Sequence, residues 1–238
     1  MTDYKDANSK DTIGVIVAMT SELEALLRIL DDTATVEHSG FRFHTGSVGR
    51  RRVVAMQCGI GKVNAAMGAM AMIEHYAPEA VVNTGIAGGT GCGPGILDVV
   101  VADEVAYHDV WCGPGNERGQ VQGCPAKFRC ATADGTPFDL SAVMARPGVH
   151  RGLIASGDMF VDTPAELERI LSVHPDAVAV DMESGAIAQV CSHMGVPFLA
   201  VRVISDYPGA EDHISQYLNF WSDAPKSTFA ILSLLLNP

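Results

Sequence analysis

Short runs of apolar and β-branched residues alternate along this chain with longer Ala-rich or amphipathic segments. The runs predict buried strands, and the segments between them predict helices. The predicted strands cover residues 12–18, 41–47, 53–57, 80–84, 99–106, 149–156, 178–180 and 198–204. The predicted helices cover residues 21–30, 63–76, 164–172, 184–194 and 225–236. This alternation indicates an α/β fold with three layers, α/β/α, around a mostly parallel central sheet.

Two of the predicted strands, 41–47 and 53–57, are joined by a short arginine-rich turn and form an antiparallel pair. We therefore expect the central sheet to be mixed. The 238 residues suit one domain of this kind, and the chain contains neither an internal repeat nor a linker. We predict a single domain over residues 12–238, preceded by a polar extension at 1–11 that we expect to be disordered.

Charge and cysteine usage limit the partners and the compartment. The net charge is −12 with only 16 Lys and Arg, so nucleic acid and an anionic membrane surface are poor partners, and a small ligand fits better. No apolar run reaches the length that spans a membrane. The six cysteines and eight histidines match no metal-ligand spacing. We therefore expect reduced thiols, no metal and a cytoplasmic location.

Acidic residues stand where predicted strands end and predicted helices begin. Asp181 and Glu183 follow a buried strand, a place where charge is costly unless it is paired or used. Glu22 lies in the first turn of a predicted helix, where by itself it would only favour the helix dipole, and Asp206 follows the last predicted strand. Separated acids in one cleft suit general acid and general base chemistry on one bond, but the pattern also fits glycosidases of other folds.

Local signals predict helix starts and close backbone approaches. Ser21 with Glu24 reads as a capping box, and Thr163 as the cap before Pro164. The glycine-rich segments at 59–62 and 85–91 lack the spacings of a P-loop and of a dinucleotide-binding turn. We expect their glycines to let a ligand approach the backbone.

Two segments show no clear period. Residues 110–137 are rich in Gly, Pro and Cys and predict a long functional loop or a subunit contact. His108 and Asp109 precede this loop with no Ser or Cys nucleophile motif nearby, so we assign them a structural role. Residues 210–223 follow a Tyr-Pro-Gly break and predict a mobile segment.

Seven short motifs occur in a fixed order between about residues 12 and 236. They are Ala18-Met19-x-x-Glu22, Gly59-Ile60-Gly61-Lys62-Val63, Asn83-Thr84-Gly85-x-Ala87-Gly88-Gly89, Tyr107-His108-Asp109, Ser156-Gly157-Asp158, Asp181-Met182-Glu183 and Arg202-x-Ile204-Ser205-Asp206. Together they resemble the bacterial methylthioadenosine/S-adenosylhomocysteine nucleosidases, a branch of the nucleoside phosphorylase superfamily. Each motif alone is weak, but the ordered set is specific for the superfamily and fairly specific for this branch.

The resemblance implies hydrolysis of the N-glycosidic bond of 5′-substituted adenosines through a ribosyl-cation-like transition state, with release of adenine. It implies that Asp206 gives or shares a proton with adenine N7, which requires a pKa raised by burial. By the same resemblance Glu22 orients and deprotonates the attacking water. Glu183 accepts the ribose 2′- and 3′-hydroxyl protons, and its charge suits the cation.

The resemblance also implies the contacts of the substrate. Met182 packs on the ribose, Phe160 stacks on adenine, Val161 reads the adenine edge through its backbone, and Arg202 lies near the water. The remaining residues of the implied binding site are Ser205, Ile60, Ala87 and Gly88. No cofactor is implied. A homodimer is implied, in which the loop at 110–118, around Trp111 and Cys112, reaches the neighbouring subunit's site.

Two departures from the nucleosidase pattern keep alternatives open. Ile86 stands where these enzymes often carry a serine that helps to hold the water, and Tyr217 is the nearest aromatic candidate for the 5′ pocket. A phosphorylase of the same superfamily is disfavoured, because residues 19–22 offer no Arg for phosphate and Glu22 would repel it. A hydrolase for another 5′-substituent such as aminofutalosine, one for another base, and a nucleoside-binding protein without turnover remain as alternatives.

Overall fold

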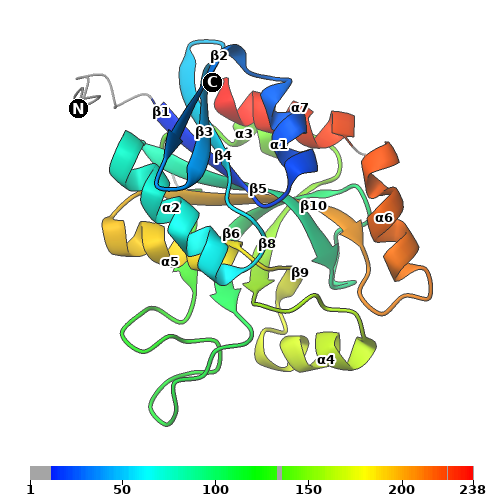
Figure 1. Ribbon diagram of the computed structural model, residues 1–238. Coiled ribbons are helices and arrows are strands. Elements are labelled where there is room, and N and C mark those ends of the chain that lie inside the picture. The colour runs from blue at the N-terminus through cyan, green and yellow to red at the C-terminus, as the bar shows by residue number, and fades with distance from the viewer. Residues whose placement is uncertain (1–11, 133–135, 224, 238) are drawn as a thin grey trace.

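A computed structural model gives the fold of residues 12–132, 136–223 and 225–237. The extension predicted at residues 1–11 lies outside this range. Ten strands in the described residues form one mixed sheet (Figure 1). They are β1 (Thr12–Val17), β2 (Asp31–His38), β3 (Phe41–Val48), β4 (Arg51–Gln57), β5 (Ala80–Gly89), β6 (Val99–Tyr107), β7 (Phe128–Arg129), β8 (Val149–Ser156), β9 (Ala177–Asp181) and β10 (Phe198–Asp206).

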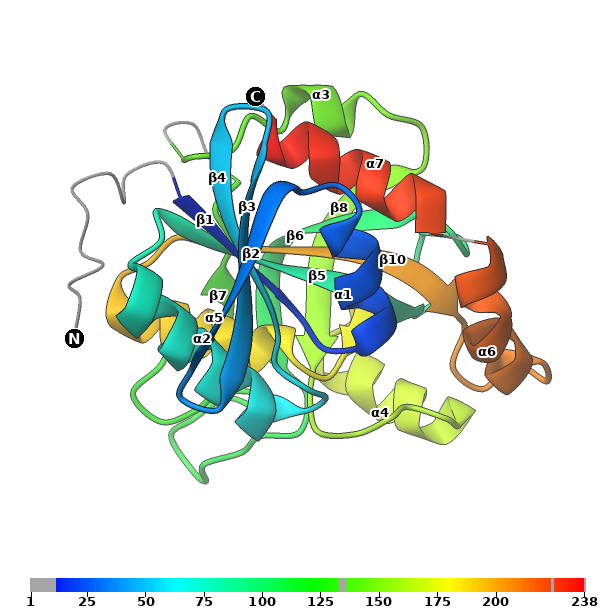
Figure 2. The same cartoon turned by 45° about the horizontal axis from the view of Figure 1, so that its top comes forward.

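The helices lie on both faces of the sheet. In the described residues they are α1 (Thr20–Leu27), α2 (Lys62–Tyr76), α3 (Ser141–Met144), α4 (Pro164–Val173), α5 (Ser184–Met194), α6 (His213–Asp223) and α7 (Pro225–Leu236). Helices α2 and α5 lie side by side on one face, and α1, α3 and α7 lie on the other (Figure 1, Figure 2). The predicted three-layer arrangement with a mixed sheet is therefore confirmed.

Five strands close into a ring. Strand β5 pairs with β10 on one side and with β9 on the other, and the path from β10 through β6 and β8 returns to β9. Strands β1, β4, β3 and β2 continue from β5 as an open sheet. As a result, the C-terminal residues of β5, β9 and β10 meet, since Gly88 pairs with both Val180 and Asp206. This meeting point is where the acids predicted from the sequence come together.

Burial explains which strands the sequence predicts well. Strands β1 and β10 are buried along their whole length, which matches their continuous apolar runs. Strand β2 is exposed along its whole length at the edge of the sheet. Because its residues are mostly polar, it carries no apolar signal and is not among the predicted strands.

Three predicted boundaries near the acids are wrong, the two ends of α1 and the end of β5. Helix α1 begins after Met19 rather than at a Ser21–Glu24 capping box, and it ends at Leu27. Strand β5 continues through the predicted glycine-rich turn to Gly89, because β9 and β10 pair with its last residues. By contrast, the cap of α4 is confirmed, since the Thr163 hydroxyl accepts the backbone N–H of Glu166 at 3.3 Å.

The two segments without a period behave differently. Within residues 110–137, of which 133–135 lie outside the described range, β7 is the strand formed and the rest is loop, as predicted. Residues 213–223, in the segment predicted to be mobile, form α6, a helix that the sequence does not predict. His213, Tyr217 and Phe220 have helical spacing, so one face of this helix can pack on the sheet.

No helix in the described part of the chain is long and apolar enough to cross a bilayer.

Candidate active site

One cavity lies where β5, β9 and β10 end. Among the residues that line it are nearly all of those predicted from the sequence to form a site: Glu22, Ile60, Ala87, Gly88, Phe160, Val161, Met182, Glu183, Ser205 and Asp206. The exception is Arg202, which is fully buried beneath the cavity. The lining also contains Met19, Ile86 and Tyr217. The fold thus brings the predicted residues together, while their roles stay predictions.

Glu22 is a buried carboxylate rather than a decoration of the helix start. Its Oε2 accepts the backbone N–H groups of Ala18 and Met19, both at 2.9 Å, and its Oε1 accepts that of Ile86 at 3.1 Å. Burial raises the pKa of Glu22 above its ordinary value, although Arg202 and the three backbone donors oppose the shift. The donors fix the direction of the carboxylate, and Ile86 takes part through its backbone.

The glycines of β5 make room for the protein's own side chains. A Cβ atom on Gly85 would overlap Oε1 of Glu22 and would lie 2.8 Å from Nη1 of Arg202. A Cβ atom on Gly89 would lie 2.8 Å from the Tyr207 ring. The expectation that a ligand accounts for these glycines is therefore wrong at Gly85 and Gly89. Gly88 does line the cavity.

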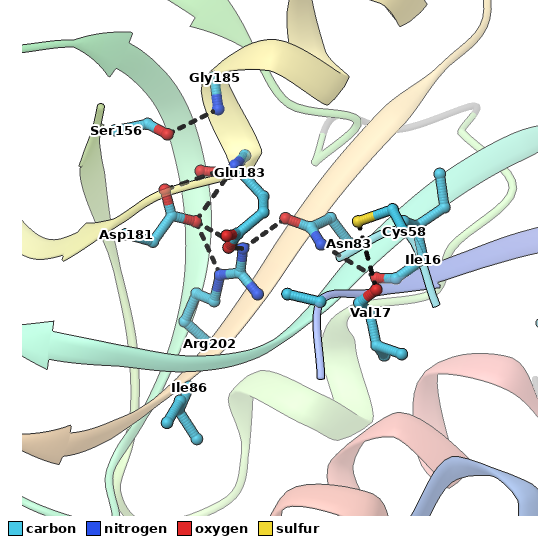
Figure 3. A network of polar contacts seen from close by, with 12 residues as sticks. Ile16, Val17, Cys58, Asn83, Ile86, Ser156, Asp181, Glu183, Gly185 and Arg202 are labelled. Atoms are coloured by element: carbon cyan, nitrogen blue, oxygen red, sulfur yellow. Dashed lines mark hydrogen bonds and ion pairs between the residues drawn. The ribbon is translucent and has the colours of Figure 1, made fainter. Parts of the chain in front are cut away.

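Arg202 organises the charges beneath the cavity (Figure 3). Its Nε and Nη2 donate to Oδ2 of Asp181 at 2.8 and 2.6 Å, and Nη2 also donates to Oδ1 of Asn83 at 2.5 Å. The same Nη2 lies 3.5 Å from Oε2 of Glu183. Burial alone would lower the pKa of Arg202, but Asp181, Glu183 and Glu22 raise it above its ordinary value. Arg202 is therefore a permanent cation at the base of the site.

Glu183 stands between β9 and α5, at the N-cap position of the helix. Its Oε1 accepts the backbone N–H of Gly61 at 2.9 Å, which ties it to the start of α2. Burial raises the pKa of Glu183 to about 7, with Arg202 opposing the shift and Asp181 adding to it. Asp181, to which the sequence analysis gives no role, is the main partner of Arg202. Both acids of this segment therefore converge on one guanidinium.

Asp206 enters the cavity through a bulge in β10. The pairing of β10 with β5 shifts by one residue between Ile204 and Asp206, so that Ser205 and Asp206 both line the cavity. The Ser205 hydroxyl makes a short hydrogen bond to Oδ1 of Asp206. Burial raises the pKa of Asp206, while Ser205 and His213 act in the opposite direction. A raised pKa suits a carboxyl that must carry a proton.

Aromatic side chains border the cavity near α6. The Phe160 ring is 44% exposed and stacks on His213, with ring centroids 5.4 Å apart and an angle of 15° between planes. Tyr217 meets the Phe160 ring edge-on, and its hydroxyl donates to Sδ of Met19 at 3.6 Å. His213 is not among the residues predicted from the sequence. Its helical spacing from Tyr217 and Phe220 is the sequence signal that points to it.

Asn83 is a second polar residue of the site for which the sequence predicts no role. It is fully buried in β5, where it accepts a hydrogen bond from Arg202 and donates one to the Ile16 carbonyl at 2.9 Å. A lone amide inside an apolar strand pattern was its signal, since a buried polar group needs partners.

The His108–Asp109 motif lies outside the cavity lining, as its predicted structural role requires. Oδ2 of Asp109 accepts hydrogen bonds from Nζ of Lys62 at 2.7 Å and from the backbone N–H of Asp158 at 2.8 Å. Oδ1 of Asp158 in turn accepts the backbone N–H of Lys62 at 2.7 Å. These contacts hold three loops together beside the site.

The charge around the cavity limits its chemistry. The carboxylates of Glu22, Glu183 and Asp206 line it, and no Lys or Arg of the described chain lies in the lining; Asp181 also borders the cavity, but its carboxylate is buried against Arg202. Such a lining repels anions and favours a ligand that is neutral or that develops positive charge. Across residues 12–132, 136–223 and 225–237, no group of three or more His, Cys, Asp or Glu is placed to hold a metal ion.

Comparison with known proteins gives one family and many related structures. The model of the phosphorylase superfamily matches residues 12–237. The methylthioadenosine/S-adenosylhomocysteine nucleosidase of Streptococcus pneumoniae, solved with a transition-state inhibitor, is 34% identical over 94% of this chain and 98% of that chain, with a TM-score of 0.84. The nucleosidase of Colwellia psychrerythraea, solved with adenine, is 32% identical over 95% of each chain, with a TM-score of 0.86.

A third similar structure has another activity. The futalosine hydrolase of Helicobacter pylori is 26% identical over 94% of this chain and 97% of that chain, with a TM-score of 0.84. The match of the superfamily model reaches from β1 to α7, and the likeness to the solved structures confirms the predicted fold. They also confirm the coarser part of the resemblance, which is the superfamily. By sequence and by fold, the chain belongs to the phosphorylase superfamily.

Proposed function

We propose that the protein hydrolyses the N-glycosidic bond of 5′-substituted adenosines, such as methylthioadenosine and S-adenosylhomocysteine, and releases adenine. The observation that carries this proposal is the meeting of Glu22, Glu183 and Asp206 around one cavity, with Phe160 at its edge. The nucleosidases of Streptococcus pneumoniae and Colwellia psychrerythraea, similar over nearly their whole length, support the same activity.

In the proposed reaction, Asp206 donates a proton to adenine N7 while the C1′–N9 bond breaks and its electron pair goes to adenine. The proton makes adenine a better leaving group. Burial and the raised pKa of Asp206 support this role, because they shift the carboxyl toward its protonated form. Glu22, held by three backbone donors, orients water toward C1′ and takes a proton from it.

Glu183 is assigned to the ribose. Its carboxylate accepts the 2′- and 3′-hydroxyl protons, and its negative charge stabilises the ribosyl cation. Because its pKa is raised to about 7, Glu183 carries this charge fully only above neutral pH or with the help of Arg202. Met182 packs on the ribose, and Phe160 and Val161 hold the adenine. Arg202 acts from beneath, by fixing Asp181 and attracting Glu183.

Hydrolysis is favoured over phosphorolysis by the charge of the cavity. A phosphate nucleophile requires cationic partners or several donors. The lining contributes carboxylates without Lys or Arg, and the guanidinium of Arg202 is already bound to Asp181 and Asn83. The backbone N–H of Ile86, a further donor, already binds Glu22. Water is therefore the nucleophile that this lining accepts.

The likeness to the futalosine hydrolase of Helicobacter pylori supports a second candidate, the hydrolysis of an adenine nucleoside with another 5′-substituent, such as aminofutalosine. Met19 and Tyr217 lie in contact at the edge of the cavity and are our candidates for the wall of the 5′ pocket. The 5′-substituent therefore separates the two candidates.

A homodimer is part of the proposal. Helix α2 exposes Val63, Met67 and Met70, and the exposed Met194 lies on the neighbouring α5. An exposed apolar surface of this kind is typical of a subunit contact. The loop at 110–118, with Trp111 half-exposed at its base, is assigned to the partner's site.

An adenine-release assay in phosphate-free buffer tests the proposal. We expect release of adenine from methylthioadenosine, S-adenosylhomocysteine or aminofutalosine. The substrate that is hydrolysed fastest identifies the preferred 5′-substituent. Asp206→Asn should lower kcat by about a hundredfold or more, because general acid catalysis contributes on this scale. Asp176→Asn is the matched control, since Asp176 is exposed and pairs with Lys127.

Three outcomes would contradict the proposal. Strict dependence on phosphate would identify a phosphorylase. Binding of methylthioadenosine without any release of adenine over hours would identify a binding protein. Activity of Asp206→Asn close to that of Asp176→Asn would remove Asp206 as the acid.

A further inference from the structure

His213 lies between two aspartates at the start of α6. Its Nε2 is 2.6 Å from Oδ2 of Asp206, and its Nδ1 is 3.1 Å from Oδ1 of Asp162. The imidazole is almost completely buried, and the Phe160 ring stacks on it. The acid of the proposed reaction is therefore in direct contact with a second group that can hold a proton.

We propose that His213 shares the transferable proton with Asp206, so that the acid of the reaction is the pair and not the carboxyl alone. The proposal rests on the proposed function for its catalytic meaning. His213 acts through Asp206 and is in this sense a positioning residue.

A count of protons around the imidazole supports the pair. Nδ1 faces a carboxylate, which only accepts hydrogen bonds when ionised, so Nδ1 carries a hydrogen. Nε2 and Oδ2 at 2.6 Å would place two lone pairs against each other unless one proton lies between them. That proton sits either on the imidazole or on the carboxyl, and both forms satisfy the contact.

The contact is short, but the ring does not point Nε2 along the ideal hydrogen-bond direction toward Oδ2. It meets the distance of an ion pair rather than the angle of a hydrogen bond. Contacts that move a proton are often poorly aligned before substrate binds and tighten in the complex. A small rotation of the imidazole against the Phe160 ring would align the pair.

The second oxygen of Asp206 has its own partner. The Ser205 hydroxyl reaches both Oδ1 of Asp206 and the Ala87 carbonyl, the latter at 3.2 Å. Because Ser205 serves Oδ1, the oxygen left for His213 is Oδ2. The two neighbours of Asp206 therefore act on different oxygens.

Other ionisable groups around His213 lie on each element packed against it. Asp162 precedes α4, and Glu166 lies behind it and accepts its backbone N–H at 3.0 Å. On α6, Asp212 accepts the Gln216 amide at 2.8 Å, and Tyr217 lies against the Phe160 ring. Burial raises the pKa of Tyr217, and the charges of Glu22, Asp206 and Glu183 add to the shift. Tyr217 thus stays neutral where the pair exchanges its proton.

The proton inventory of one turnover closes. The pair delivers its proton through Asp206 to adenine N7, and the electron pair of the C1′–N9 bond goes to adenine. Water adds to C1′ and gives a proton to Glu22. After the products leave, Glu22 returns that proton to solvent. The pair takes one up from solvent on the side of Asp162, whose side chain is 57% exposed.

Sharing the proton extends the pH range of the acid. Two groups that share one proton hold it at least as tightly as one of them would beside a neutral neighbour, because the bound state then has two forms. His213 lowers the pKa of the Asp206 carboxyl itself, but the proton that leaves the carboxyl then stays in the pair on the imidazole. The pair as a whole therefore keeps the proton to a higher pH than Asp206 beside a neutral side chain. The acid limb of the pH profile depends on groups outside the pair, among them Glu183.

The test compares kcat/KM as a function of pH in the wild type, His213→Gln and His150→Gln. The control His150 also pairs with an aspartate, Asp98, at 3.0 Å, but neither residue lines the cavity. In His213→Gln, Asp206 must hold the proton alone. We expect the basic limb to move to lower pH by about one unit and kcat/KM near pH 8 to fall about tenfold, with a smaller deficit near pH 5.5.

Asp162→Asn is a second variant that leaves both members of the pair in place. It removes the charge that favours the imidazolium, so the basic limb should move in the same direction by a smaller amount. It also keeps the test decisive if His213→Gln fails to fold. If both variants lower kcat/KM equally at every pH, His213 only packs against Phe160 and the inference is wrong.

A readout without turnover separates this inference from the proposed function. A proton shared between Nε2 and Oδ2 should give a strongly downfield proton NMR signal coupled to the His213 nitrogen. The signal should persist in His150→Gln and disappear in Asp206→Asn and His213→Gln. The signal without adenine release would overturn the proposed function and leave the pair. Adenine release with no signal and an unshifted pH profile would overturn the pair.

Discussion

Arg202 is the residue on which the charges of the site depend. It is completely buried, and so is the carboxylate of Asp181 that it binds at 2.6 Å. Removing two ions from water costs several kcal/mol each, and their attraction offsets this only when the remaining donors and acceptors are satisfied. Nη2 of the guanidinium also donates a hydrogen bond to Asn83 and forms an ion pair with Glu183. The network is therefore sensitive to the loss of any one member.

This sensitivity gives a prediction for Arg202→Met. The variant leaves Asp181 and Glu183 as uncompensated buried carboxylates, so the free energy of unfolding should fall by about 3–5 kcal/mol. Chemical denaturation of this variant and of a control variant measures the change in the free energy of unfolding. Arg42→Met is the control, because the Arg42–Glu37 pair is 66% and 72% exposed, and its loss should change stability by less than about 1 kcal/mol. Equal losses in both variants would mean that the buried network does not stabilise the fold.

At this scale the sequence predicts acids better than their partners. Glu183 and Asp206 are identifiable because charge beside buried strands needs a reason, whereas Glu22 is identifiable only through the family resemblance. Asp181 meets Arg202, and Asp206 meets His213, only after the strands have paired. Such contacts join residues that are distant in the chain, and no local pattern encodes them. Local signals can therefore point to His213 and Asn83, but not to the acid or the guanidinium that each one contacts.

Strand β5 shows how one element serves several neighbours. Its early residues are buried apolar side chains, and its last residues are glycines that allow β9, β10 and Glu22 to approach. A bulge in β10 at Ser205 lies opposite the same glycines. The position of the three acids therefore depends on the absence of side chains along this strand end.

Gly85→Ala tests this dependence. Its methyl group would overlap Glu22 and crowd Arg202, so we expect a loss of about 1–3 kcal/mol in stability. Displacement of Glu22 should also lower adenine release by about a hundredfold. Gly95→Ala is the matched control, because the nearest atom to its Cβ would be Oδ2 of Asp98 at an ordinary 3.5 Å. Near wild-type activity of Gly85→Ala would show that the close approach is not required.

The elements that the sequence predicts are those whose local pattern and burial agree. Strands β1 and β10 have apolar residues on both faces and are buried on both. Strand β2 and helix α6 fail this condition for opposite reasons. Strand β2 is polar, and its pairing with β3 orders it. Helix α6 follows the Tyr-Pro-Gly turn, and its contacts with β10 order it. Tertiary contacts decide these two elements, so their own residues do not reveal them.

At the scale of the whole molecule, one face is left apolar. Val63 and Met67, one helical turn apart on α2, are 69% and 55% exposed. The long loop at 110–127 extends from the body near α5 (Figure 1). The proposed dimer would cover this face and bring the loop of one subunit to the site of the other.

The double variant Val63→Glu with Met67→Glu should dissociate this dimer. Two carboxylates in an apolar interface cost several kcal/mol, so the dissociation constant should rise by about a hundredfold or more. Sedimentation over a dilution series measures it, and KM for the substrate should rise as the partner's loop is lost. Ile96→Glu, also at an exposed apolar position, should leave the assembly unchanged. A monomeric wild type would contradict the proposal.

The closed ring of strands also sets the order in which the molecule becomes functional. Leu199 of β10 pairs with Val82 of β5, so a large part of the chain lies between these two paired residues. Contacts at such separation require a long loop to close before they stabilise anything, which slows folding. Because Asp206 ends the strand that completes the ring, a nascent chain holds no complete set of acids until β10 has docked. Recovery of catalysis during refolding would therefore report the last folding event.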